Sequence, residues 1–187
     1  FQDTDNKKKY VYATSWGVST RLIGALIMVH GDDKGLRLPP NIAPIQVVIV
    51  PIFKNEDDLN KINNYLKSTL KYFNKHNIIY YMDNRTKLSP GFKFNEWEMK
   101  GVPIRLEVGG RDMDNGEVFT ARRDTGEKFS LNLDLASIKI PELLDEIQAS
   151  LFNQALEFRS KNTYSVSTWD EFKTKIEQGG FIKCGWD

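Results

Sequence analysis

An arginine and two hydroxyl side chains stand where an extended segment gives way to a helical one. Residues 10–16 are rich in tyrosine and β-branched side chains and predict a strand, which Gly17 then interrupts. Ser19 is the predicted N-cap of an amphipathic helix that runs to His30. The first turn of a helix presents free N–H groups, and Arg21 adds a full positive charge there. The pattern fits a site for an anion, such as a triphosphate. By spacing alone, the favoured alternative is that Arg21 is an ordinary surface arginine and Trp16 a core aromatic.

The other side chains that could do chemistry have simpler structural interpretations. No cysteine, serine or second histidine stands at a spacing that builds a triad or a metal site with His30, so it is read as the end of the helix. Asp32 and Asp33 fit a solvated turn. A structural zinc site needs about four ligands, and the chain holds one cysteine, Cys184, followed by Trp186 and Asp187. We therefore predict no metal in this chain.

Composition narrows the class of protein. The chain has 187 residues, 40% of them hydrophobic, which is enough for one medium core or two smaller ones. Its 26 basic and 25 acidic residues give a net charge of +1, which excludes a broad polybasic surface. A single cysteine requires no oxidising compartment, and the longest apolar run, residues 22–29, is too short to cross a bilayer. We expect a cytoplasmic protein without membrane contact.

Three separated blocks carry a resemblance to a known family. The first comprises residues 16–21, 30–36 and 38–40 and continues through residues 43–51, the second comprises residues 101–109, and the third residues 122–128. In this order they resemble prolyl-tRNA synthetases, which are class II aminoacyl-tRNA synthetases, in the archaeal and eukaryotic-like type. The first block resembles the third class II motif. The resemblance implies a C-terminal fragment that lacks the two earlier motifs and is inactive alone.

The resemblance also implies a reaction. Proline and ATP form prolyl-adenylate, and the prolyl group then passes to the 3′ end of proline tRNA. Arg21 is the implied catalytic residue and binds ATP together with Ser19, while Ser15, Trp16 and Gly17 line the pocket for proline and the adenylate. Mg²⁺ is expected in the full enzyme with ligands outside this chain, and the full-length enzyme is expected to be a homodimer.

A second set of residues is implied for the tRNA anticodon, which carries two guanines in proline tRNA. Basic side chains suit guanine O6 and N7, and acidic ones suit the N1–H and N2 groups. Residues 103–108 alternate, so that Arg105 and Glu107 face away from the apolar side of a predicted strand. By composition alone this would be an ordinary mixed-charge surface. At places that match the family, the implied anticodon-binding residues are Glu98, Arg105, Asp112 and Lys128.

The expected fold class is α/β, in three parts. Residues 1–43 are the strand-helix end of a catalytic domain, residues 44–147 an anticodon-binding domain with a mixed sheet of roughly five strands, and residues 148–187 the start of a small α+β domain. Pro39 and Pro40 mark the first boundary. Strands are predicted at residues 46–52, 78–82, 103–108, 118–122, 128–133 and 181–186, and helices at residues 56–75 and 90–100, from Pro141 onward and after Thr168.

Local signals refine three of these elements. Residues 114–116 predict a hairpin turn, and Pro141 predicts the first turn of a long helix. Thr168 with Glu171 predicts a capping box. Two other functions stay open: a catalytically silent module that binds RNA or protein, and a synthetase for threonine, histidine or glycine. The arginine in the first block speaks against a pure binding module.

Overall fold

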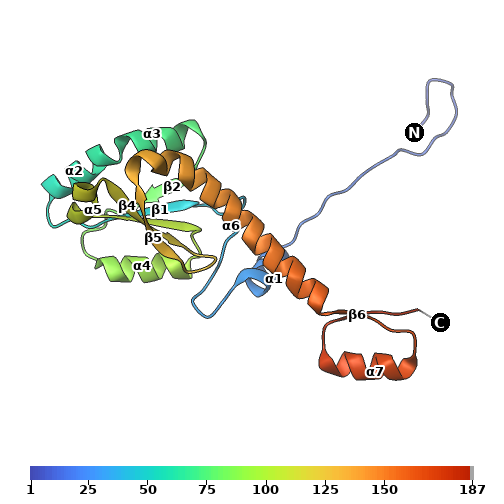
Figure 1. The fold of residues 1–187 in the computed structure, drawn as a ribbon. Coiled ribbons are helices and arrows are strands. Elements are labelled where there is room, and N and C mark those ends of the chain that lie inside the picture. The colour runs from blue at the N-terminus through green and yellow to red at the C-terminus, as the bar shows by residue number, and fades with distance from the viewer. Residues whose placement is uncertain (186–187) are drawn as a thin grey trace.

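The computed structural model describes residues 1–185, and its larger lobe is built on a mixed five-stranded sheet (Figure 1). β1 is parallel to β2 and β3, whereas β3, β4 and β5 are antiparallel neighbours. This confirms the predicted mixed α/β sheet. In spatial order the strands are β2 (Tyr80–Met82), β1 (Val47–Pro51), β3 (Ile104–Val108), β4 (Glu117–Arg122) and β5 (Lys128–Asn132).

One face of the sheet carries the main hydrophobic core. Helices α2 (Glu56–Tyr65), α3 (Lys67–Lys75) and α6 (Leu133–Lys161) cover it. Every residue of β1 is buried, as predicted for a central strand covered on both faces. The largest fully buried side chains include Phe73, Ile49, Ile62, Leu106 and Ile147.

The opposite face is covered only in part. Helix α4 (Pro90–Met99) packs Phe94 and Trp97 against Val48 and Val50 of β1. Ser89 caps this helix, since its hydroxyl accepts a hydrogen bond from the Phe92 amide, and Pro90 occupies the first turn. The same face continues across β3, β4 and β5, where Lys128 and Ser130 are exposed.

Two helices differ from the sequence-based expectation. The predicted helix at residues 56–75 is interrupted at Leu66, which ends α2 and precedes α3. The predicted hairpin turn at residues 114–116 is wrong, because the short helix α5 (Gly110–Asn115) connects β3 to β4. Gly116 ends α5 with a φ of 70°, a left-handed conformation that glycine adopts without steric cost. The sequence therefore predicts the turn at Gly116 but not helix α5 before it.

Helix α6 begins earlier than Pro141 predicts. Asn132 is its N-cap and accepts a hydrogen bond from the Asp134 amide at 2.9 Å. Pro141 therefore lies inside the helix, where it removes one backbone hydrogen bond. Burial of Ala136 and Ile140 on the turns before the proline offsets this loss. The predicted boundary between residues 147 and 148 falls within α6.

The N-terminal segment is extended and exposed (Figure 1). The predicted strand at residues 10–16 is wrong: no described residue pairs with it, and a strand needs a partner for its backbone groups. Helix α1 (Arg21–His30) forms as predicted, but Thr20 occupies the N-cap position and Ser19 does not. No residue of α1 is buried, although the helix contacts α6.

Backbone close to α4 fastens the segment after α1 to the sheet lobe. The Leu36 amide donates to the Met99 carbonyl at 2.9 Å, and the Leu38 amide donates to the Gly101 carbonyl at 3.1 Å. Gly101 has a φ of 76°, and a Cβ there would lie 2.6 Å from the Leu36 carbonyl carbon. Gly35, with a φ of 126°, meets the backbone of Met99 in the same way. Glycine at both positions permits this contact.

The C-terminal part is a small α+β unit at the far end of α6 (Figure 1). Strands β6 (Thr163–Ser165) and β7 (Phe181–Lys183) pair in parallel and flank α7 (Trp169–Gln178). The predicted capping box of Thr168 and Glu171 is confirmed. Of the described part of the predicted last strand, residues 181–185, only residues 181–183 are a strand, and Trp186 and Asp187 lie outside the described residues.

Candidate nucleic-acid interface

A small pocket of about 70 Å³ opens on the sheet face beside α4. Sheet register explains its position, because Arg105 of β3 pairs with Ala121 of β4, and Ala121 pairs with Lys128 of β5. These three residues therefore form one row across the same face. Glu98, in the last turn of α4, borders the row. Three of the four predicted anticodon-binding residues thus lie around one pocket.

Arg105 is more buried than a free binding face predicts. Its side chain is only 9% exposed, because α4 covers this part of the sheet. The guanidinium stacks over the Phe94 ring at 4.6 Å, and its Nε donates to Glu107 Oε1 at 2.9 Å. Nη1 lies 3.4 Å from the Phe94 carbonyl oxygen. The guanidinium of Arg105 is therefore fixed by Glu107 and Phe94 and lines the pocket.

Glu98 is fixed by its backbone and keeps an accessible carboxylate. Its carbonyl oxygen accepts a hydrogen bond from Arg123 Nε at 2.9 Å. The side chain is 29% exposed, and Oε1 lies 3.4 Å from Lys34 Nζ. Lys128 is exposed at the start of β5 on the other side of the pocket. The pocket therefore offers both hydrogen-bond donors and an acceptor.

Asp112 does not join this pocket. It lies in α5, after the carboxyl end of β3, whereas Arg105 lies near the start of that strand. Its Oδ2 accepts a hydrogen bond from the Gly109 amide at 2.7 Å, so the Asp112 side chain caps the start of α5. The sequence pattern could not distinguish anticodon binding from helix capping for Asp112, because an aspartate at this position fits both roles.

Three cations around the pocket were not assigned a role from the sequence. Arg122 is the last residue of β4, Arg123 follows it, and Lys34 lies in the turn after α1. All three fall within the blocks that carry the family resemblance, which was the available signal. The Arg122 guanidinium donates hydrogen bonds to the carboxylate of Asp124 and, at 2.9 Å, to the carboxylate of Glu146 in α6.

Arg123 forms the ion pair that joins the turn after α1 to the pocket. Its Nη1 and Nη2 donate to the two carboxylate oxygens of Asp32 at 2.8 and 2.5 Å. This guanidinium lowers the pKa of the Asp32 carboxyl to about 2. The predicted solvated turn is therefore a fixed turn, and Asp32 is committed to Arg123.

The residues implied for ATP and proline do not form a pocket among the described residues. Ser15, Trp16, Gly17 and Ser19 are all exposed, and Trp16 is 93% exposed. Arg21 is the first residue of α1 and is exposed. His30 ends the same helix as predicted, and partial burial together with the charge of Arg37 lowers the pKa of its imidazole.

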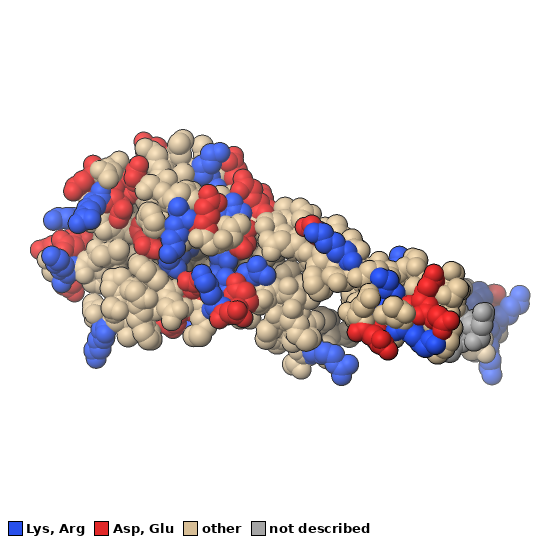
Figure 2. All heavy atoms as spheres, turned by 60° about the horizontal axis from the view of Figure 1, so that its bottom comes forward, with Lys and Arg blue, Asp and Glu red and all other residues tan. Residues whose placement is uncertain are grey.

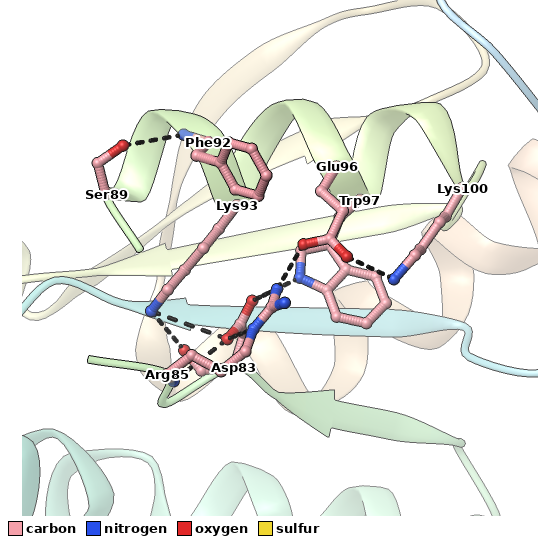
Figure 3. A network of polar contacts seen from close by, with 8 residues as sticks. All are labelled: Asp83, Arg85, Ser89, Phe92, Lys93, Glu96, Trp97 and Lys100. Atoms are coloured by element: carbon pink, nitrogen blue, oxygen red, sulfur yellow. Dashed lines mark hydrogen bonds and ion pairs between the residues drawn. The ribbon is translucent and has the colours of Figure 1, made fainter. Parts of the chain in front are cut away.

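A second polar cluster lies on the β1 and β2 side of α4 (Figure 3). Asp83 is fully buried and accepts hydrogen bonds from Arg85 and from Trp97 Nε1, the latter at 2.8 Å. Lys93 Nζ donates to the Asp83 carbonyl at 3.0 Å. Burial by itself would raise the pKa of the Asp83 carboxyl, but the hydrogen bonds from Arg85 and Trp97 lower it to about 2. This cluster holds α4 against the sheet.

Charge is mixed on the face of the larger lobe that Figure 2 shows. Basic and acidic side chains alternate there, consistent with the net charge of +1. This face therefore carries no broad basic patch of the kind that binds a phosphate backbone without specificity. Among residues 1–185, no three His, Cys, Asp or Glu side chains gather as a metal site would require, and Cys184 is exposed. Over the same range, no helix is long and apolar enough to cross a bilayer.

Comparison with known proteins places these features in a family. A family model described as "Anticodon binding domain" matches residues 46–149. Proteins named proline–tRNA ligase from Bacteroides fragilis, Porphyromonas gingivalis and Chlorobaculum tepidum are 49%, 48% and 50% identical to this chain. Each alignment covers 100% of the chain and 38% of the relative, so the chain spans well under half the length of these proteins.

Proposed function

The chain belongs to the family of anticodon-binding domains, and on that premise we propose that it recognises the anticodon of proline tRNA as part of a proline–tRNA ligase. The observation that carries the proposal is the gathering of Glu98, Arg105 and Lys128 around one pocket. The names of the relatives favour proline over threonine, histidine or glycine.

The geometry suits a guanine base. O6 and N7 of guanine are acceptors, which the terminal nitrogens of Arg105 and the ammonium of Lys128 can meet. N1–H and the N2 amino group are donors, which the Glu98 carboxylate can accept. The pocket is small and stands on a sheet face, so the base enters edge-on from an unstacked RNA loop. Adenine offers a donor where guanine has O6 and is disfavoured.

The activity of the whole protein is the second part of the proposal. The full-length protein activates proline with ATP and transfers the prolyl group to the 3′ end of proline tRNA. Arg21 and Ser19 contact ATP, while Ser15, Trp16 and Gly17 line the pocket for proline and the adenylate. Exposure of all five residues supports a site completed by parts of the protein beyond this chain. The described residues offer no cluster that fits Mg²⁺.

Two further features complete this proposal. The full-length protein is a homodimer, as the resemblance implies, and it works in the cytoplasm, where tRNA is charged for translation. Domain limits at residues 43/44 and 147/148 are retained as a proposal, although α6 runs through the second limit.

Arg105→Gln tests the anticodon pocket in the full-length protein. Because a bidentate contact contributes roughly 1–3 kcal/mol of discrimination, we expect about tenfold or greater weakening of binding to an anticodon stem–loop of proline tRNA. Discrimination against a stem–loop with adenine in place of the guanines should fall as well. ATP–pyrophosphate exchange should stay near wild type.

Arg111→Gln is the matched control, since Arg111 is exposed in α5, away from the pocket, and loses the same charge. Unchanged affinity and discrimination in Arg105→Gln would refute the proposal. Equal loss in binding and in exchange would indicate a folding defect, which a thermal unfolding curve of the variant identifies.

A further inference from the structure

The turn of residues 32–35 contributes Lys34 to the lining of the pocket, although it belongs to the segment after α1 rather than to the sheet domain. Its backbone is closed by two hydrogen bonds between Asp32 and Gly35, both at 3.0 Å. Asp32 Oδ1 also accepts the Lys34 amide at 2.9 Å. One carboxylate thus shapes the turn and, through Arg123, fastens it to the sheet.

Lys34 extends from this fixed turn to the rim of the pocket. Its side chain is 68% exposed, and Nζ lies 3.4 Å from Glu98 Oε1. An exposed ion pair at that distance contributes little to stability, so the ammonium keeps donors directed to solvent. Because Lys34 Nζ lies beside the Glu98 carboxylate, a nucleotide whose base donated to Glu98 would have the ammonium within reach of its backbone. Such phosphate contacts fix register without reading sequence.

We propose that Lys34 is a further RNA-contacting residue that binds a backbone phosphate next to the guanine pocket, and that the Asp32–Arg123 pair positions it. This inference rests on the proposed function of the pocket. Asp32 and Arg123 are positioning residues, because they act through the turn. The segment after α1 therefore takes part in anticodon binding together with the sheet domain.

Salt dependence separates a phosphate contact from a base contact. Each phosphate contact adds roughly 0.7–1 to the slope of log affinity against log salt. In the full-length protein, we expect Lys34→Gln to weaken binding of the proline stem–loop roughly threefold to tenfold near 0.1 M salt and to lower the slope by about one contact. Discrimination between guanine and adenine stem–loops should be unchanged.

Asp32→Asn tests the positioning role through the sign of its effect. Removal of a negative charge should strengthen RNA binding if only net charge matters. Loss of the turn should weaken it, as Lys34→Gln does, and combining the two substitutions should add little. Asp33→Asn is the matched control, since it removes the same charge from a neighbour for which no ion pair is found among residues 1–185.

The outcomes separate the two proposals. A normal affinity and salt slope in Lys34→Gln, with discrimination lost in Arg105→Gln, would overturn this inference and leave the proposed function standing. Tighter binding in Asp32→Asn, equal to that in Asp33→Asn, would overturn the positioning role. Normal binding in both Lys34→Gln and Arg105→Gln would remove the proposed function itself.

Discussion

The two candidate sites differ in how much of their surroundings this chain supplies. Around Arg105, three strands, α4 and the turn after α1 converge within the described residues. Around Arg21, the chain supplies one helix without buried residues and an extended segment (Figure 1). Both arginines stand in conspicuous motifs. Only Arg105 has its guanidinium fixed by neighbours, because a fixed side chain needs packing from elements distant in sequence.

The two regions also differ in how much they contribute to the stability of the fold. Arg105 lies within a packed sheet, so its orientation depends on the core behind it. Trp16 and its neighbours contribute exposed surface and no core contacts. Substitutions in the two regions should therefore affect different measurements, and the following three experiments test this separation.

The largest effect is expected on stability, from Phe73→Ala. Phe73 of α3 is fully buried in the main core, and truncation of a buried phenylalanine costs about 3–5 kcal/mol. Trp16→Ala removes a larger side chain that is 93% exposed and should change the free energy of unfolding by less than about 0.5 kcal/mol. Urea unfolding of this chain measures both. Similar losses would show that the N-terminal segment is packed in solution.

A smaller effect is expected on catalysis, from Arg21→Lys in the full-length protein. Lysine keeps the charge but cannot meet two phosphate oxygens with a planar fork. We expect ATP–pyrophosphate exchange to fall roughly 100-fold, comparable with loss of one transition-state donor. Stem–loop binding should be unaffected. Exchange near the wild-type rate would remove Arg21 from the ATP site and favour a catalytically silent module.

The smallest effect is expected from pH. The pKa of Asp83 is about 2, below its ordinary value of 3.8, so its stabilising contribution is complete above about pH 4 and is lost as pH falls through 2. Asp83→Asn should cost roughly 1–3 kcal/mol at pH 7, because the hydrogen bonds from Arg85 and Trp97 and the ion pair with Lys93 lose the carboxylate charge.

In urea unfolding, the free energy of unfolding of the variant should also have a shallower slope against pH between pH 4 and 2 than that of the wild type. Part of the slope should remain, because the pKa of Asp32 is likewise about 2. A variant with the full wild-type slope would show that Asp83 is not ionised in the folded protein.

Local signals predicted those elements whose stabilising contacts lie within a few residues. The capping box of Thr168 and Glu171 and the start of α4 at Ser89 and Pro90 are examples. Side-chain alternation in β3 gave the right faces but not the burial of Arg105, because burial depends on α4 packing over the sheet. The N-terminal strand failed for the same reason, since strand pairing is a non-local interaction.

By itself the sequence determined the five strands of the sheet, the family blocks and which residue types could bind an anion or a guanine. Only the tertiary structure decided which of those residues meet. It brought Glu98, Arg105 and Lys128 together, assigned Asp112 to a helix cap, and paired Asp32 with Arg123 across 91 positions. The physical reason is that sheet register and helix packing set distances between side chains, and neither is encoded in local spacing.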